Sequence, residues 1–197
     1  MELLLVRHGE TLENVKGIVQ GQTAGGALTE KGIRQAEKVA KELRGEKIDI
    51  IYSSDLERAK RTAVIISKNH LVPVLFTPLL RERSFGEYEG GPTERIDEWA
   101  EKTGKNRYHV EPKGGETIDE FYSRVKGVLA KIAASHHGNE KVVIVTHKGA
   151  MRMILAAVKG ISPLEAMSIP SENAEVVRVN VSEAVAEKLR GPKKLKA

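Results

Sequence analysis

Short apolar runs that alternate with helix-like segments are the feature that most limits the fold of this 197-residue chain. The strand-length runs are residues 3–6, 48–52, 73–76 and 142–145, and residues 175–181 alternate like a final strand. Apolar side chains recur at helical spacing in residues 29–44, 54–66, 117–132 and 150–158. Thr29 is a predicted N-cap, and Ser54 to Glu57 and Thr117 to Glu120 have the pattern of a capping box. Alternation of this kind is typical of a mostly parallel sheet with helices on both faces. We therefore predict a three-layer α/β/α sandwich.

One long segment interrupts this alternation. Residues 77–115 hold many glycines, prolines and charges, with one fair helix near residues 93–103. Long connections inside compact domains are usually functional. We predict a small cap over the rim where the strands end. Since one domain usually takes roughly 100 to 200 residues, we expect a single domain, 1–197, with a cap and substrate excursion at about 77–115.

Composition excludes several classes of protein. The chain has no cysteine, which removes disulfides, thiolate metal sites and cysteine nucleophiles. No apolar run approaches the roughly 20 residues that a membrane helix needs. The first residues lack the features of a secretory signal. We therefore expect a cytoplasmic protein without a membrane partner.

The net charge of +5 leaves several kinds of anionic partner open. Against nucleic-acid binding stand an aromatic content of 4% and the lack of a recognition helix or zinc module. The basic tail with Lys193, Lys194 and Lys196 is interpreted as solvated surface. His136 and His137 are adjacent, which is not the spacing of a helical zinc site. We expect no nucleic acid and no metal, and the sequence leaves a homodimer open.

Two of the predicted strands end in histidine. His8 lies in Arg7-His8-Gly9, and His147 is followed by Lys148-Gly149. Because ligands of open parallel sheets bind beyond the carboxyl ends of the strands, both histidines are expected at one rim. Arg7 and Arg58, the latter at the start of a helix, would join them. Their planar, permanently charged guanidinium groups match a phosphate or a carboxylate.

Four motifs, in this order along the chain, carry a resemblance to a known family. They are Arg-His-Gly-Glu-Thr at 7–11, Ser-Ser-Asp-Leu-Glu-Arg-Ala at 53–59, Leu-Arg-Glu at 80–82 running into Phe-Gly-Glu-Tyr-Glu-Gly at 85–90, and Thr-His at 146–147. Together they resemble the signature of the histidine phosphatase superfamily, in its phosphoglycerate mutase-like branch. The match spans nearly the whole chain.

The resemblance implies a catalytic set. His8 would be the nucleophile and form a phosphohistidine. Arg7, Arg58 and His147 would bind the phosphoryl oxygens and compensate their charge. Glu82 would protonate the leaving oxygen and later take a proton from water.

The resemblance also implies a binding set. Its phosphate- and substrate-binding members are Arg7, His8, Asn14, Gln20, Gly21, Gln22, Arg58, Glu82, Arg83, His147 and Lys148. The chain departs from the pattern in residues 22–27, which lack an arginine and an aspartate that many relatives have, and at Lys148, where many have glycine. Lys148 either adds a charge for an anionic substrate or faces solvent.

The implied activity is that of a histidine acid phosphatase-like phosphoric monoester hydrolase. We predict that it hydrolyses a small anionic phosphorylated metabolite and needs no cofactor. The alternative is a cofactor-dependent phosphoglycerate mutase, which would require 2,3-bisphosphoglycerate. The resemblance implies that such mutases have a lysine shortly after the motif at 86–90 and an arginine pair further along; here residues 90–94 contain no lysine, and no two adjacent arginines precede Gly114. Arg83, Lys105 and Arg107 then remain as partners for a substrate carboxylate.

Overall fold

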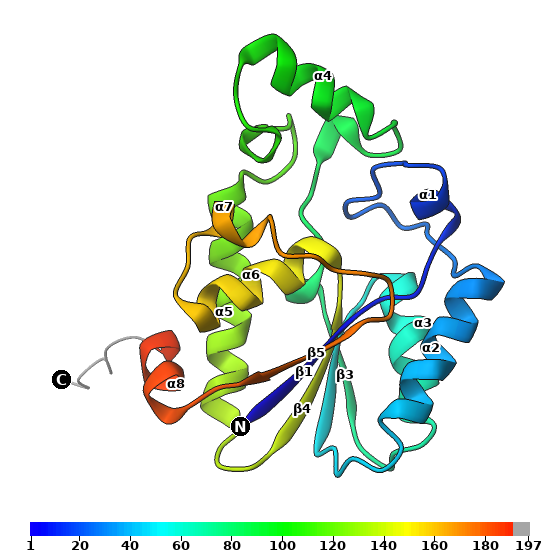
Figure 1. The fold of residues 1–197 in the computed structure, drawn as a ribbon, viewed down its shortest axis with the longest axis vertical. Helices are drawn as coiled ribbons and strands as arrows, with labels where there is room; N and C mark the ends of the chain where they lie inside the picture. Colours follow the sequence, from blue (N-terminus) through cyan, green and yellow to red (C-terminus); the bar gives the residue numbers. More distant parts are fainter. Residues whose placement is uncertain (191–197) are drawn as a thin grey trace.

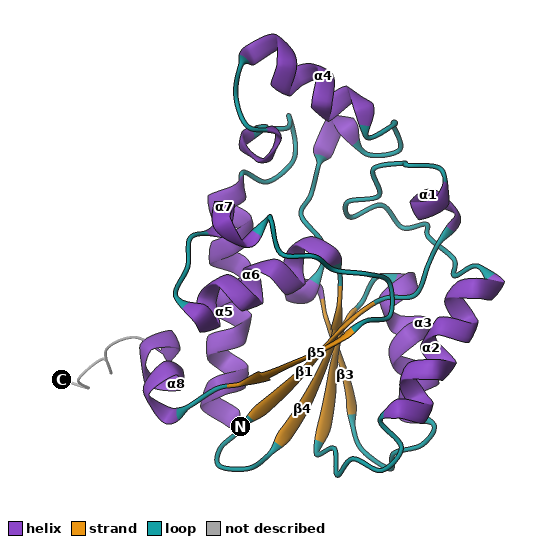
Figure 2. Ribbon diagram, in the orientation of Figure 1, coloured by secondary structure: helices purple, strands orange, loops and turns teal. Residues whose placement is uncertain are grey.

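Five strands form one sheet between two layers of helices in the structure, a computed structural model that describes residues 1–190 (Figures 1 and 2). The strands are β1 (Glu2–Arg7), β2 (Ile50–Ser54), β3 (Val74–Thr77), β4 (Lys141–Thr146) and β5 (Val176–Asn180). Their order is β3-β2-β4-β1-β5; the first four are parallel, and β5 pairs with β1 antiparallel. The predicted α/β sandwich with a mostly parallel sheet is confirmed.

Residues 1–190 contain eight α-helices, of which only some cover the faces of the sheet. They are α1 (Leu12–Val15), α2 (Glu30–Glu42), α3 (Glu57–Ser67), α4 (Glu94–Thr103), α5 (Ile118–Ser135), α6 (Lys148–Lys159), α7 (Pro163–Ala166) and α8 (Glu183–Arg190), with 3-10 helices at Pro78–Leu80, Gly86–Tyr88 and Arg107–His109. α2 and α3 pack on one face, and α5 and α6 pack on the other, with α8 beside α5 (Figure 1). The short helices α1 and α8 were not predicted from the sequence.

Side chains of β1 explain why its apolar run is continuous. Leu3 and Leu5 pack in the cluster with α5 and α6, whereas Leu4 and Val6 pack in the cluster with α2 and α3. Successive strand residues point to opposite faces, so a strand covered on both sides must be apolar at every position. The same pattern buries Val142 to Val145 of β4 completely.

The predicted helix starts are correct at two places and wrong at one. Thr29 caps α2 by accepting a hydrogen bond from the backbone of Gly32, and Thr117 forms a capping box with Glu120 at α5. The capping box predicted from Ser54 to Glu57 does not form. Leu56 is the N-cap of α3 and makes no side-chain cap. The Ser54 hydroxyl has another partner, described below.

The connection from β3 to α5 lies beyond the carboxyl ends of the strands, next to the loop that follows β1 (Figure 1). These two segments are joined by backbone hydrogen bonds between Val19 and residues 90–91, and by a bridge between Ile18 and Pro92. A small apolar cluster of Val19, Ile96 and Val110 supports α4 above the rim. The long excursion therefore covers the edge at which the strand-end histidines lie.

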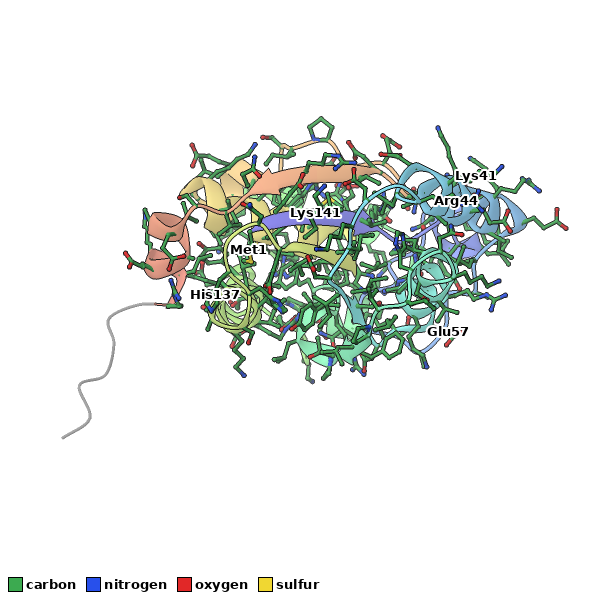
Figure 3. The ribbon with its side chains drawn as sticks, turned by 90° about the horizontal axis from the view of Figure 1, so that it is seen from below. Met1, Lys41, Arg44, Glu57, His137 and Lys141 are labelled. Carbon is green, nitrogen blue, oxygen red and sulfur yellow. The ribbon has the colours of Figure 1, made fainter. Side chains whose placement is uncertain are left out.

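The opposite end of the sheet, where Figure 3 shows Lys141, carries an ion-pair network. Lys141 at the start of β4 contacts Glu2 and Glu46, and Arg178 of β5 contacts the same two carboxylates.

None of the helices in residues 1–190 combines the length and the apolar character that a membrane-spanning segment needs. The basic tail at Lys193, Lys194 and Lys196 lies outside the described residues.

Candidate active site

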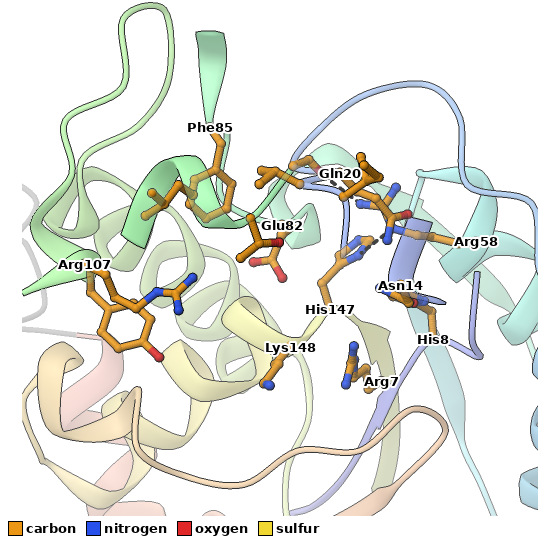
Figure 4. A pocket seen from close by; sticks show the side chains of 16 residues that line it. Arg7, His8, Asn14, Gln20, Arg58, Glu82, Phe85, Arg107, His147 and Lys148 are labelled. Atoms are coloured by element: carbon orange, nitrogen blue, oxygen red, sulfur yellow. Dashed lines mark hydrogen bonds between the residues drawn. The ribbon is translucent and has the colours of Figure 1, made fainter. Parts of the chain in front are cut away.

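The carboxyl ends of β1, β2 and β4 bring the predicted residues around one cavity of about 240 Å³ (Figure 4). Its charged and imidazole side chains are Arg7, His8, Arg58, Glu82, Arg107, His147 and Lys148. Parallel strands end at the same edge of the sheet, so residues that are far apart in the chain meet there. The predicted convergence of the two histidines and two arginines is therefore what the structure contains.

His8 is held as a neutral imidazole with one nitrogen free. Its ring is 3% exposed, and Nδ1 lies 2.7 Å from the carbonyl oxygen of Gly9. A carbonyl oxygen only accepts, so Nδ1 carries the hydrogen and Nε2 keeps its lone pair. Burial and then the charge of Arg58 lower the pKa of His8 to about 3, although the bond to Gly9 opposes this shift. A neutral ring with a free nitrogen is the form of histidine that can act as a nucleophile.

His147 lies beside His8, with ring centroids 5.2 Å apart. It is the N-cap residue of α6. Arg58 Nε donates to its Nδ1 over 3.2 Å, so the hydrogen of the neutral ring is on Nε2, which donates to Ser54 Oγ over 2.9 Å. Burial, followed by the charge of Arg58, lowers the pKa of His147 well below its usual value. The bond to His147 is what occupies Ser54.

Arg7 and Arg58 each keep a guanidinium nitrogen without a partner in the described part of the chain. Arg58 donates through Nη2 to the carbonyl of Gly21 (2.7 Å), and Arg7 donates through Nη1 to the carbonyl of Ser171 (2.9 Å). Arg58 Nη1 and Arg7 Nε are buried and unpaired. Buried donors rarely lack an acceptor. An oxyanion bound next to His8 is the acceptor that fits both arginines.

Glu82 lies across the cavity from Arg58 and is held by backbone groups (Figure 4). Its Oε1 accepts from the N–H of Arg83, and its Oε2 accepts from the N–H of Gly149, both at 2.9 Å. A Cβ at position 149 would overlap the Glu82 carboxylate, so any other residue there would force this carboxylate to move. The glycine two residues after His147 therefore brings the acid close to the second histidine.

Arg124 of α5 positions Glu82 and was not found from the sequence. It donates to the carbonyls of Leu79, Arg81 and Glu82 and forms a two-pronged ion pair with Glu116. Burial pushes the pKa of Glu116 up, but hydrogen bonds from Arg124 and Ser84 bring it below its usual value. The one signal in the sequence is an arginine on a largely apolar helix, which does not indicate its partners.

Two of the predicted binding residues do not line the cavity. Gln22 turns away and donates to the carbonyl of Glu82 (3.1 Å). The guanidinium of Arg83 is bound to three cap carbonyls, those of Tyr108, Val110 and Glu116. The Arg83 guanidinium is therefore not free to bind a substrate carboxylate. The predictions that Gln22 and Arg83 line the binding cavity are wrong. Adjacency to Glu82 in the sequence could not reveal which way Arg83 points.

Asn14, Gln20, Gly21 and Lys148 do line the cavity, as does Arg107, whereas Lys105 lines a separate surface hollow. The sequence did not indicate the apolar part of the wall. It comes from the loop after β1 and from the cap, and consists of Ile18, Val19, Phe85, Ile96 and Tyr108, with Thr93 beside them. Short patterns do not reveal which apolar residues of irregular segments face a ligand.

Comparison with known proteins was made at the level of sequence and of structure. The sequence signature described as "Histidine phosphatase superfamily (branch 1)" matches residues 3–190. The chain is similar to the metal-independent phosphoserine phosphatase of Arabidopsis thaliana, with 38% identity over 160 residues that cover 78% of this chain and 66% of the plant protein. It is also similar to the adenosylcobalamin/alpha-ribazole phosphatase of Escherichia coli, with 33% identity over 85% of this chain and 83% of that protein.

A solved structure shows the same likeness in three dimensions. The alpha-ribazole phosphatase from Shigella flexneri superimposes with a TM-score of 0.81 and 27% sequence identity. The match covers 93% of this chain and 92% of the other.

Proposed function

The chain belongs to the histidine phosphatase superfamily, and from that premise we propose that it hydrolyses phosphomonoesters of small metabolites through a phosphohistidine on His8. The observation that carries this proposal is the pairing of a neutral His8, whose Nε2 is free, with unpaired donors of Arg7 and Arg58. Such a site combines a nucleophile with cations that compensate the charge of a phosphoryl group in transit.

In the first step, His8 Nε2 attacks phosphorus and the ester P–O bond breaks. Arg7 and Arg58 bind the oxygens of the phosphoryl group. Glu82, in its protonated form, donates its proton to the leaving oxygen, so the alcohol departs neutral. His147 uses both ring nitrogens for Arg58 and Ser54 here, and a direct bond from His147 to phosphate would replace the bond to Ser54.

In the second step, water attacks the phosphorus of phosphohistidine, and the P–N bond breaks. Glu82, now a carboxylate, takes a proton from the attacking water. Inorganic phosphate leaves, and His8 returns to its neutral form with Nδ1 still bound to Gly9. The same carboxylate therefore serves as acid and then as base, and its two backbone donors hold it in place for both steps.

We also propose that the enzyme is histidine acid phosphatase-like in its pH range. The pKa of His8 is lowered to about 3, so the nucleophile stays neutral through the mildly acidic range. We propose that turnover persists at pH 5, where a histidine with an ordinary pKa would be mostly protonated and unable to attack.

We propose hydrolysis rather than the mutase reaction for this chain. The relatives described above are named as phosphatases, and the names include phosphoserine and alpha-ribazole phosphates as substrates of those proteins. We propose that this chain acts on phosphomonoesters of small metabolites, because its cavity of about 240 Å³ is small and lies under the cap. Within residues 1–190, no group of three or more histidine, cysteine, aspartate or glutamate side chains is placed to hold a metal ion.

The test is phosphate release from p-nitrophenyl phosphate by the wild type, by His8→Asn and by the matched control His109→Asn. His109 is an exposed histidine of the cap outside the cavity. We expect activity to survive EDTA, to disappear in His8→Asn and to persist in the control. Full activity of His8→Asn would contradict the mechanism. Interconversion of phosphoglycerates that 2,3-bisphosphoglycerate stimulates far above phosphate release would identify a mutase instead.

A further inference from the structure

The proposed chemistry leaves one cation of the cavity without a task. Lys148 is the first residue of α6 and follows His147 directly. It lines the main cavity and also an adjoining one of about 150 Å³. Among residues 1–190, no carboxylate lies within ion-pair distance of its ammonium group. An unpaired lysine at the wall of a ligand cavity calls for an explanation.

Other cations surround Lys148 and increase the local positive charge. Arg152 follows one turn later on α6; it is 8% exposed, and its Nε donates to the carbonyl of Ile169. Burial, followed by the charges of Arg152 and Arg7, lowers the pKa of Lys148, while Glu172 and Glu82 act in the opposite direction. Cations placed together repel one another, so an anion bound among them is stabilised.

A charge balance of the cavity indicates how much anion it needs. Arg107 is paired with Asp97 at 2.7 Å, which leaves Arg7, Arg58 and Lys148 as its unpaired cations. Glu82 must be protonated when it donates to the leaving oxygen, so it carries no charge in that step. A phosphate dianion then balances two of the three cations. One positive charge remains for a second anionic group.

The position of Lys148 indicates which part of the substrate carries that group. In Figure 4, Lys148 lies below Glu82, between Arg107 and Arg7, whereas His8 and Arg58 lie on the other side of His147. Glu82 faces the leaving oxygen, so the alcohol extends from the phosphate toward the Glu82 side of the cavity. The alcohol therefore passes Lys148, with the apolar wall of Phe85 beside it.

We propose that Lys148 binds a second anionic group, a carboxylate or a phosphate, on the alcohol part of the substrate. This inference rests on the proposed phosphatase function and deepens it, because it makes phosphomonoesters with a second anionic group the preferred substrates. Lys148 is then a specificity residue: it contacts the substrate but takes no part in proton or phosphoryl transfer. The adjoining cavity shares Lys148, Phe85 and Glu82 with the main one, is lined by Arg83 and Arg152 as well, and leaves room for the chain that carries the group.

Matched substrates test this proposal. O-phosphoserine and O-phosphoethanolamine differ only in the carboxylate, and fructose 1,6-bisphosphate and fructose 6-phosphate differ in the second phosphate. The readout is the ratio of kcat/KM within each pair. We expect the wild type to prefer the member with the second anionic group in at least one pair, and Lys148→Gln to lower that ratio about tenfold or more, as loss of a charged hydrogen bond does. Lys148→Arg should keep most of the ratio.

The control is Lys159→Gln, which removes the exposed lysine at the other end of the same helix. It should leave both ratios at the wild-type values, and far-UV circular dichroism should show that each variant is folded. A fall in the serine pair alone assigns a carboxylate, and a fall in the fructose pair alone assigns a phosphate. Unchanged ratios in Lys148→Gln, or a wild type without preference, would overturn the inference while phosphatase activity stands. No turnover of any substrate, p-nitrophenyl phosphate included, would overturn the proposed function with it.

Discussion

Burying His8 as a neutral ring makes the stability of the protein depend on pH in a defined direction. Its pKa is about 3 in the folded protein and 6.5 for a free side chain. Between these values the unfolded chain binds a proton that the folded chain does not, so the free energy of unfolding rises with pH and is lost as pH falls below 6.5. Each pH unit in this window changes the unfolding equilibrium constant about tenfold.

The magnitude at pH 5 follows from this slope. About 1.5 pH units separate pH 5 from 6.5, which corresponds to about 2 kcal/mol for His8 alone. We expect the free energy of unfolding of the wild type to fall by about 2 kcal/mol more than that of His8→Asn between pH 7 and pH 5. Urea unfolding followed by far-UV circular dichroism measures this difference. The buffers must be free of phosphate, because a bound ligand stabilises the folded state.

A control variant and the contribution of a second buried histidine must be taken into account in this measurement. His109→Asn, at the exposed cap histidine, should follow the wild type at both pH values. His147 is also buried with a lowered pKa, so His8→Asn keeps the part of the pH dependence that comes from His147. Parallel curves for the wild type and His8→Asn would refute the conclusion that folding holds His8 neutral.

Three further changes test the support of the site. Gly149→Ala should lower kcat at least tenfold in steady-state assays, because its methyl group would displace Glu82; an unchanged kcat would contradict the close approach. Arg83→Met should reduce the free energy of unfolding in urea by at least about 2 kcal/mol, since it leaves three cap carbonyls unpaired; wild-type stability would show that the cap does not depend on it. Thr117→Ala should lower the free energy of unfolding by about 1 kcal/mol in the same assay, because α5 loses its N-cap hydrogen bond. An unchanged free energy of unfolding would mean that this N-cap does not stabilise the protein.

The parts of the fold that the sequence predicts are those with a strong local cause. The apolar runs of β1 and β4 indicate strands because a strand buried on both faces has no polar position. α1 and α8, with four and eight residues, are too short for periodicity to reveal. The false capping box at Ser54 has a tertiary cause, since the hydroxyl that would cap a helix binds His147 instead.

Some residues of the active site could likewise be predicted from the sequence, and others could not. His8 and His147 could be predicted to meet because the rule for parallel strands places their ends together. The direction of Arg83 and the role of Arg124 could not, because both depend on which backbone carbonyls the folded cap and rim present. Lys148 is intermediate: the sequence marks it as unusual, and the structure places it in the cavity wall.

The clasp made by Arg83 bears on how such an enzyme could be given a new substrate. Arg83 lies near the start of the cap, and its side chain donates to the carbonyls of Tyr108, Val110 and Glu116 near the end, while its backbone N–H holds the carboxylate of Glu82. The cap is therefore not an independent module that can be exchanged at its ends. A transplanted cap that did not offer carbonyls to Arg83 would release the residue next to the proton donor, and altered specificity would come with impaired catalysis.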